Sequence, residues 1–287
     1  MDPAVFAVTT RSRLRGLRYF PFMLVASLRI RGQLARTPGC VRWASIVAGP
    51  REFWTITVWE SRDKMLDFMR SGAHEDIMWL FGKWLRSFWL MRWRLTGEER
   101  GTWDGLRIGM SGDRPFQPRA TTPEARAALA AALDALPYLK AAAADDGAPT
   151  YDTSPMARRQ RQLVSGGAAV VLRLEVSRLW RAPQGWLQLR RLNRDLREHP
   201  DVLRWVVGVS LPHEFYALAV LRNDEACSAF LARPEHAALT ERWGDDYWVM
   251  SWQPANEFGH WDGLRLRRQR LKSSIPVPDQ AARAAQD

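Results

Sequence analysis

Cysteine is scarce in this chain of 287 residues, which contains only Cys40 and Cys227. Two cysteines are too few to indicate a disulfide framework or a zinc site. The sequence also lacks a run of about 18 uncharged apolar residues, so we expect no transmembrane helix. Its first residues lack the apolar core of a secretory signal peptide. These absences favour a protein of the reducing cytoplasm.

The motifs of several common enzyme classes are missing as well. The sequence shows no phosphate-binding glycine loop, no arrangement typical of a Ser-His-Asp triad or a Cys-His pair, and no metal-spaced His/Cys cluster. Hydrolytic, nucleotide-dependent and zinc chemistry are therefore not expected.

Positive charge is abundant but unevenly placed. The formal net charge is +11, which by itself would suggest a nucleic-acid partner. Twelve Lys and Arg residues lie in three acid-free windows, 11–18, 158–161 and 265–272. The rest of the chain is close to neutral. We therefore expect no specific nucleic-acid partner and only a weak attraction to an anionic membrane surface.

The clearest feature is an internal repeat, in which residues 37–75 match 199–237 at a constant offset of 162. Matched positions include Pro38/Pro200, Arg42/Arg204, Trp43/Trp205, Pro50/Pro212, Phe53/Phe215, Phe68/Phe230 and His74/His236. Both copies end in the pentapeptide WDGLR, at 103–107 and 261–265. Rare residues shared in the same order are hard to obtain by chance, so we infer a tandem duplication.

Each copy shows the order β-α-β-β-α-β. In the first copy we expect strands at 21–28, 41–47, 52–60 and about 88–95, with helices at about 29–36, after Ser61 and from 74 to about 84. In the second copy we expect strands at 169–176, 202–210, 214–222 and about 246–252, with helices at about 185–198 and from 224 to about 243. The Ser61 hydroxyl can cap the helix that follows it.

A β-α-β-β-α-β unit forms a four-stranded antiparallel sheet with both helices on one face, and its other face needs a cover. The predicted fold is therefore α+β, with two ferredoxin-like repeats packed sheet to sheet as an intramolecular dimeric α/β barrel. Such a pseudo-dimer can be a monomer or a homodimer. The predicted domains are a basic N-terminal arm (1–20), the first repeat (21–109), an Ala/Pro-rich linker with a helix at 123–136 (110–167), the second repeat (168–267) and a basic disordered tail (268–287).

Two segments resemble known families. TVWESRDKMLDFMRSGAH (57–74) resembles the antibiotic-biosynthesis monooxygenases of the dimeric α/β-barrel superfamily. GTWDGLRIG (101–109), repeated as GHWDGLRLR (259–267), is similar to the end of spheroidene monooxygenase-like proteins. The resemblance covers about 21–109 and 168–267. It implies a monooxygenase-like oxidoreductase of natural-product biosynthesis, on a frame that also hosts isomerases, haem enzymes and non-catalytic proteins.

The same resemblance implies that the cofactor is either haem or none. His74 and His236 are then the candidate haem ligands, and Arg42 is a candidate partner for a haem propionate. This chain departs from the haem-degrading members, because His74 lies about one helical turn before the expected ligand position, near which Met78 stands.

Five tryptophans, taken from 15 in the chain, could form an aromatic wall for a flat apolar substrate: Trp43, Trp54, Trp59, Trp79 and Trp205. His74 could act as a general base, and Glu60 is a nearby acid in the first copy only. The alternative for each candidate is structural. His74 and His236 could cap a helix or fill a helix–sheet seam, the tryptophans could fill the core, and Arg42 could be solvated. Both Trp-Asp-Gly motifs are predicted to close the ends of the barrel.

The leading hypothesis is a monooxygenase-like enzyme that acts on an apolar or aromatic substrate inside the barrel. Oxygen would be activated by a haem on His74, or would react directly with a substrate that a base has deprotonated. The alternatives are a cofactor-free isomerase or cyclase, and a non-catalytic barrel that binds a hydrophobic ligand.

Overall fold

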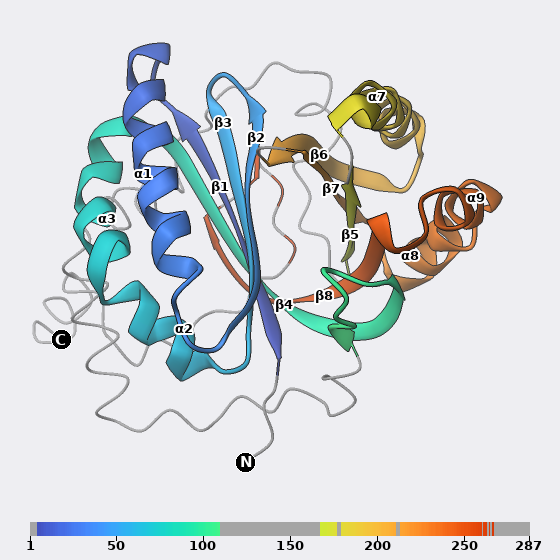
Figure 1. The fold of residues 1–287 in the computed structure, drawn as a ribbon, viewed down its shortest axis with the longest axis horizontal. Helices are drawn as coiled ribbons and strands as arrows, with labels where there is room; N and C mark the ends of the chain where they lie inside the picture. Colours follow the sequence, from blue (N-terminus) through green and yellow to red (C-terminus); the bar gives the residue numbers. More distant parts are fainter. Residues whose placement is uncertain are drawn as a thin grey trace, which may run out of the picture.

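The computed structural model describes residues 5–109, 167–176, 179–210 and 213–259, together with 261, 262, 264 and 266. Within these residues the chain has an α+β fold in which eight strands form one closed barrel, in the order β1-β3-β2-β6-β7-β5-β8-β4. All neighbouring strands run antiparallel. The helices lie on the outside of this barrel (Figure 1).

The two halves have the same succession of elements. The first comprises β1 (Phe6–Leu14), α1 (Phe20–Leu34), β2 (Cys40–Gly49), β3 (Glu52–Trp59), α2 (Arg62–Met69), α3 (Gly72–Trp84) and β4 (Leu85–Gly101). The second comprises β5 (Ala168–Glu175), α7 (Ala182–Glu198), β6 (Val202–Ser210), β7 (Glu214–Leu221), α8 (Asp224–Leu231), α9 (Pro234–Trp243) and β8 (Tyr247–Gly259). Among the described helices, none has both the length and the apolar character needed to cross a bilayer.

The strand expected at 21–28 is wrong, because these residues lie in α1. Met23 and Ala26 are buried while Phe22 and Val25 are exposed, so the apolar run follows a helical period rather than the alternation of a strand. The first strand is β1, within the segment predicted to be a basic arm. The arginines of this segment suggested a solvated arm, but Arg11 is buried.

Most other strands and helices lie where they were expected. Ser61 caps α2 by accepting a hydrogen bond from the backbone N–H of Lys64 at 3.3 Å. Asn223 does the same for α8 with the N–H of Ala226, at 2.9 Å. The helix expected from 224 to 243 is divided into α8 and α9, and Pro234 begins the second part. The predicted linker helix and the C-terminal tail lie outside the described residues.

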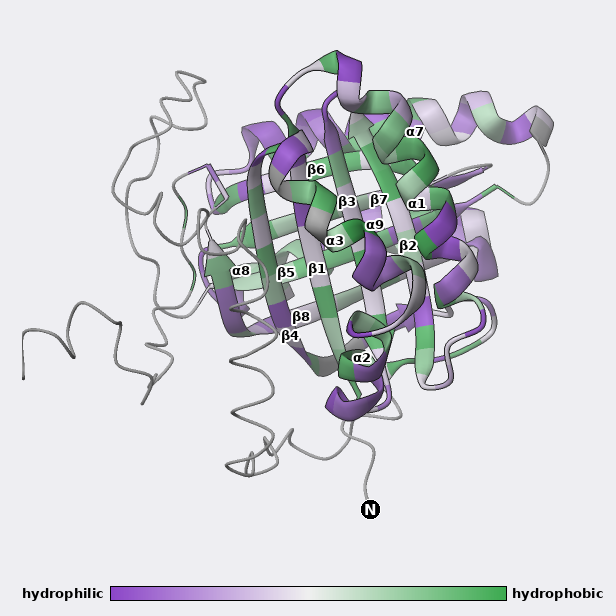
Figure 2. Cartoon of the chain, turned by 90° about the vertical axis from the view of Figure 1, so that its left-hand side faces the viewer, coloured by the Kyte–Doolittle hydropathy of each residue, from purple (hydrophilic) through white to green (hydrophobic). Residues whose placement is uncertain are grey.

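Alternation along the strands separates two cores. Side chains that point into the barrel include seven nearly inaccessible tryptophans: Trp54, Trp89, Trp93, Trp103, Trp248, Trp252 and Trp261. Side chains that point outward, such as Phe53 and Trp59, pack under the helices instead. Figure 2 shows α1, α2 and α3 lying across the outer face of β1, β2 and β3. The barrel interior is thus filled by aromatic rings, and the space under these helices is separate from it.

Instead of two separate sheets packed face to face, the strands of the two halves join into one closed barrel through two strand pairs. β4 and β8 pair along an extended register from Trp89 to Gly101, whereas β2 and β6 meet at Val47 and Val209. Trp103 and Trp261, the first residues of the two Trp-Asp-Gly motifs, are buried in the barrel core and form bridges with Leu106 and Leu264. Arg42 holds the first turn by donating to the carbonyls of Trp103 and Asp104, at 2.8 and 3.0 Å.

The second turn is held in the same way. Arg204 donates to the carbonyls of Trp261 and Asp262, at 3.4 and 2.9 Å. Asp104 and Asp262 both adopt positive φ angles, 51° and 47°, a conformation that Asp tolerates better than most residues. These matched arginines therefore serve the architecture.

Candidate functional site

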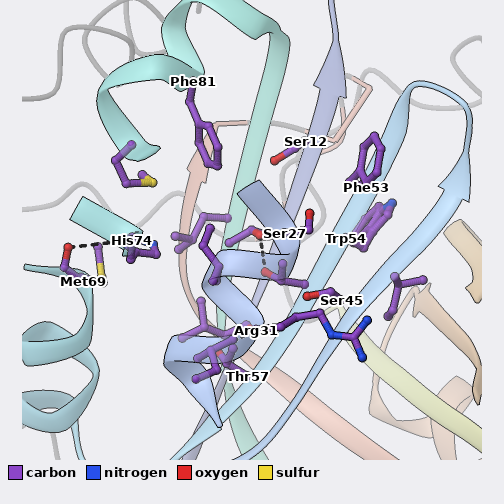
Figure 3. A pocket seen from close by; sticks show the side chains of 18 of the residues that line it. Ser12, Ser27, Arg31, Ser45, Phe53, Trp54, Thr57, Met69, His74 and Phe81 are labelled. Atoms are coloured by element: carbon purple, nitrogen blue, oxygen red, sulfur yellow. Dashed lines mark hydrogen bonds between the residues drawn. The ribbon is translucent and has the colours of Figure 1, made fainter. Parts of the chain in front are cut away.

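A cavity of about 160 Å³ lies between the helices α1–α3 and the outer face of β1–β4 (Figure 3). Its volume is comparable with that of an engineered apolar cavity of about 150 Å³ that binds benzene. Outward-facing residues of the strands form its floor, and α1, α2 and α3 form its roof. Large apolar side chains dominate the lining, among them Met23, Leu28, Phe53, Phe68, Met78 and Phe81. The site was expected inside the barrel, but this cavity lies outside it, because tryptophans fill the interior.

His74 lines this cavity from the first turn of α3. Its backbone N–H donates to Oε1 of Gln33 on α1 at 2.8 Å. Its ring packs on Phe68, with 4.8 Å between the ring centroids, and its Nδ1 lies 3.2 Å from the carbonyl oxygen of Met69. These contacts hold the imidazole at the edge of the cavity (Figure 3).

The contact with Met69 also determines the tautomer of His74. A carbonyl oxygen only accepts hydrogen bonds, so Nδ1 carries the proton and Nε2 keeps its lone pair. Burial lowers the pKa of His74 to about 4, although the hydrogen bond to Met69 opposes this shift. The imidazole is therefore neutral near pH 7, which is the form that a general base or a metal ligand requires.

The predicted aromatic residues are divided by the structure. Trp59 lines the cavity from under the helices, and Trp54 also borders it although its ring packs in the barrel core. Trp43 packs beside it under the helices, where the guanidinium of Arg31 lies 5.2 Å from its ring centre. Trp205 belongs to the second half and donates to Oδ1 of Asn193 at 2.9 Å. The side chain of Trp79 lies outside the described part of the structure.

His236, the counterpart of His74 in the repeat, has a different environment. It is buried on α9, its Nδ1 lies 2.9 Å from the hydroxyl of Tyr247, and its ring packs on Phe230 at 4.5 Å. Burial and the nearby Arg233 lower the pKa of His236 to about 4. It does not contribute to the cavity, so the structure does not bring the two histidines together.

Glu60 and Arg42 also lie away from the cavity. Glu60 is exposed just after the end of β3, and Arg42 is engaged by the Trp103–Asp104 turn. Neither side chain is part of the cavity lining. The structure therefore does not bring Glu60, the predicted nearby acid, to the cavity that His74 lines.

Sequence reasoning missed the polar part of the cavity. Arg92 of β4 and Arg31 of α1 line it, together with the hydroxyl groups of Thr10, Ser45, Thr55 and Thr57. The Ser45 hydroxyl is buried and has no hydrogen-bond partner among the described residues. The sequence signal for these polar residues is their shared outward-facing register, in which Thr55 lies opposite both Thr10 and Ser45. This register could be predicted only once β1 was placed correctly.

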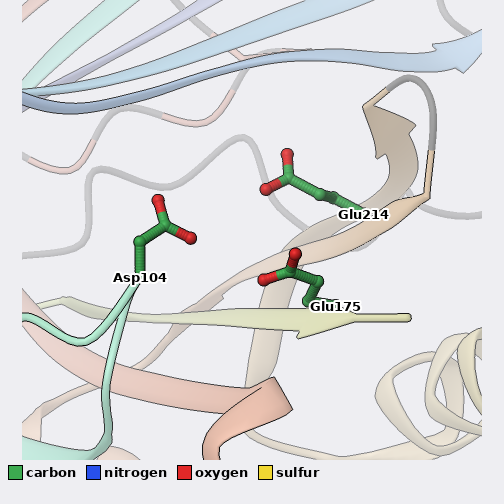
Figure 4. Close-up of side chains that lie close together, drawn as sticks. All are labelled: Asp104, Glu175 and Glu214. Carbon is green, nitrogen blue, oxygen red and sulfur yellow. The ribbon is translucent and has the colours of Figure 1, made fainter. Parts of the chain in front are cut away.

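Three carboxylates outside the cavity, those of Asp104, Glu175 and Glu214, face one another (Figure 4). Their oxygen atoms lie within 4.8 Å, as they would in a metal site. Arg173 occupies this position instead, because its Nη2 donates to all three at 2.6–2.7 Å. The cluster is therefore an ion-pair network in which three partly exposed carboxylates surround the buried Arg173 guanidinium, and we assign no metal to it.

The cavity does not suit a haem. Pockets for drug-sized ligands measure about 300–1,000 Å³, and a porphyrin is at least as large as such ligands. The 160 Å³ available is well below this range. His74 offers a nitrogen that could bind iron, but Arg42, the expected propionate partner, is held elsewhere. We therefore derive no chemistry from a haem here.

Comparison with known proteins gives structural similarity alone. No protein-family model matches the chain, and no curated protein matches it. A candidate monooxygenase from Fusobacterium nucleatum is 5% identical, with a TM-score of 0.35, covering 90% of this chain and 96% of the other. One from Lactobacillus acidophilus is 9% identical, with a TM-score of 0.32 and coverages of 89% and 96%.

An aldoxime dehydratase is 11% identical to this chain, with a TM-score of 0.43, covering 88% of this chain and 82% of the other. At such scores, these similarities assign neither a family nor an activity to this protein.

Proposed function

We propose that this protein is a monooxygenase-like enzyme that acts on a small apolar or aromatic substrate in the cavity under α1–α3. In this proposal His74 is the general base and the chain needs no resident cofactor. The observation that carries it is a neutral imidazole at the edge of a cavity that is lined mainly by apolar side chains. The oxygenase class itself comes from the sequence resemblance of residues 57–74 and 101–109.

The proposed reaction begins when Nε2 of His74 removes a proton from an activated C–H group of the substrate. The resulting carbanion reduces molecular oxygen. One oxygen atom becomes a carbonyl on the substrate and the other leaves as water, so a CH₂ group and O₂ give C=O and H₂O. The apolar walls exclude water from the carbanion and orient the flat substrate.

We also propose that the halves are two copies of one ferredoxin-like unit, and that the first copy alone performs catalysis. His74 opens on a cavity, whereas the position of His236 is closed by Phe230 and Tyr247. The first half would then carry the active site and the second half would complete the barrel. We propose that the protein acts in the cytoplasm.

The test is oxygen consumption by the full chain with a panel of oxidisable phenols and polycyclic ketones. His74→Ala should abolish turnover, while His199→Asn, at a histidine outside the cavity, should leave it unchanged. Full activity in His74→Ala would overturn the assignment of the base. Titration with haemin should give no Soret band that depends on His74, and such a band would restore the haem hypothesis.

A non-catalytic ligand carrier is the second candidate, because no acid accompanies His74 in the lining. It predicts saturable binding of the same compounds without conversion. Product analysis after prolonged aerobic incubation separates the two functions.

A further inference from the structure

Arg92 places a positive charge in the cavity without an acidic partner. Its side chain extends from the outer face of β4, where the residue lies opposite Val8 of β1. Among the described residues, none forms an ion pair or hydrogen bond with it. The lining contains a second arginine, Arg31, but no Asp or Glu. The cavity is therefore apolar and electropositive.

A third arginine, outside the lining, adds to the positive charge. Arg62, the first residue of α2, opposes the charge of Arg92, and its Nε is buried without a hydrogen-bond partner among the described residues. Burial, and then this repulsion, lower the pKa of Arg92 to about 10. A guanidinium group that lines a mainly apolar cavity without an acidic partner is costly unless an anion binds it.

We propose that the cavity binds an apolar ligand that carries a carboxylate, with the carboxylate on Arg92 and the apolar body against the helix roof. The proposal rests on the proposed function, since it names the substrate class of the same cavity. A carboxylate matches the planar donor pair of a guanidinium. Its single charge also costs less to bury than that of a phosphate dianion.

Calorimetric titration of the full chain with 1-naphthaleneacetate and with 1-naphthaleneacetamide tests this proposal. The two probes share a ring system and differ in the charged group. We expect the carboxylate to bind at least about tenfold more tightly, the size of one charge-assisted hydrogen bond. Arg92→Met should remove this preference, and Arg92→Lys should restore part of it.

The matched control is Arg29→Gln, which removes a positive charge from an exposed pair with Asp76 on the same side of the molecule. It should leave the preference unchanged. Equal binding of the two probes to the wild type, or an unchanged preference in Arg92→Met, would overturn the proposal. Turnover of uncharged substrates would leave the proposed function standing in that case. A charge preference without turnover would instead reject the proposed function and keep this inference.

An independent observation concerns α7 and the short helix before it. Three large apolar side chains here are mostly exposed, namely Trp180 (64%), Trp186 (55%) and Leu187 (56%). Arg181 and Arg190 lie over the two indole rings, 5.3 and 5.9 Å from their centres. The following part of α7, about two turns, has a basic surface, because Arg190, Arg191, Arg194 and Arg197 are all exposed.

We infer that this end of α7 binds an anionic lipid bilayer. Tryptophan beside arginine on an amphipathic helix is typical of the membrane interface, where indole rings lie among headgroups and arginines meet lipid phosphates. The positive charge of the helix complements an anionic surface and does not favour a second copy of the same basic face.

Sedimentation of the protein with vesicles tests this second inference. Binding is expected to vesicles of equal parts phosphatidylcholine and phosphatidylglycerol, and not to pure phosphatidylcholine. W186A/L187A should lose most of this binding, whereas Leu80→Ala, an exposed residue of α3, should retain it. Undiminished binding by the double variant, no binding by the wild type, or equal binding to both vesicle types would reject α7 as the docking site.

Discussion

Arg173 and Asp104 form an ion pair of 2.7 Å between the first strand of one half and the closing turn of the other. Arg11 and Asp262 form the reciprocal pair at 2.8 Å. Each arginine also pairs with a glutamate of its own half, Arg173 with Glu214 and Arg11 with Glu52. Because both guanidinium groups are buried, these links tie each half to the turn of the other.

Replacing Arg173 should therefore destabilise the whole barrel. Arg173→Gln leaves Glu175, Glu214 and Asp104 facing one another without their shared cation, and because these carboxylates are partly exposed the loss should be about 1.5–3 kcal/mol. Chemical denaturation should show this loss in the free energy of unfolding. Arg222→Gln, in a solvent-exposed pair with Asp201, should cost less than about 1 kcal/mol. Equal effects of the two variants would contradict this role.

Gly101 is the second position where we expect a large effect on stability. Its φ is +77°, and an added Cβ would lie 2.0 Å from the carbonyl oxygen of Tyr247. Gly105 has a similar φ of +75° with nothing near its missing Cβ. Gly105→Ala should then cost about 1–2 kcal/mol from backbone strain alone, and Gly101→Ala clearly more. Thermal unfolding of the two variants separates the clash from the strain.

Much of the fold was predictable from the sequence because strands such as β3 combine β-branched and aromatic residues, and because Ser61 and Asn223 are strong helix caps. The position of β1 was missed, since charged residues suggested a solvated arm. The repeat offset of 162 carries Arg11 onto Arg173 and Glu52 onto Glu214, so extending the repeat towards the N-terminus would have located this strand. Local hydropathy cannot show that Arg11 and Arg173 are buried, because each pairs with an aspartate of the other half.

The site was predictable only in part. His74 and Trp59 lie at the cavity as single residues of the expected types, but the cavity itself depends on which face of β3 points outward. In the structure, Thr55 and Trp59 are on the outward face of β3 under the helices, and Trp54 is on the face towards the barrel interior. Arg92 belongs to no recognisable sequence motif. What distinguishes it is the absence of Asp and Glu from the cavity lining, which only the three-dimensional structure shows.

His236 should make stability depend on pH in a defined window. Its folded-state pKa of about 4 is below the usual 6.5, so the unfolded chain binds more protons between these values. The stability of the wild type is therefore full above about pH 6.5 and is lost as the pH falls towards 4, by about 3 kcal/mol from this residue. His236→Gln should show a shallower fall in denaturation experiments, and an identical slope would contradict the prediction.

Ser45 offers a test of the balance between stability and binding. Its buried hydroxyl lacks a partner among the described residues and lines the cavity. Ser45→Val removes the unpaired group and adds apolar volume in a strand, which should stabilise the fold by about 1 kcal/mol. The same change should weaken the binding of 1-naphthaleneacetate. A variant that is both more stable and a better binder would place the ligand away from β2.

The pH dependence of turnover distinguishes His74 as a base from a residue of ordinary acidity. A free histidine loses its base form below about pH 6.5. His74, with a pKa lowered to about 4 by burial, keeps the lone pair on Nε2 between pH 6.5 and about 4. The acid limb of the kcat/KM profile should then fall near pH 4–5, provided that stability is measured in parallel. Phe68→Leu removes the ring that covers the imidazole, so it should move this limb upward towards 6.5. A limb that starts near 6.5 in the wild type would assign proton transfer to a different group.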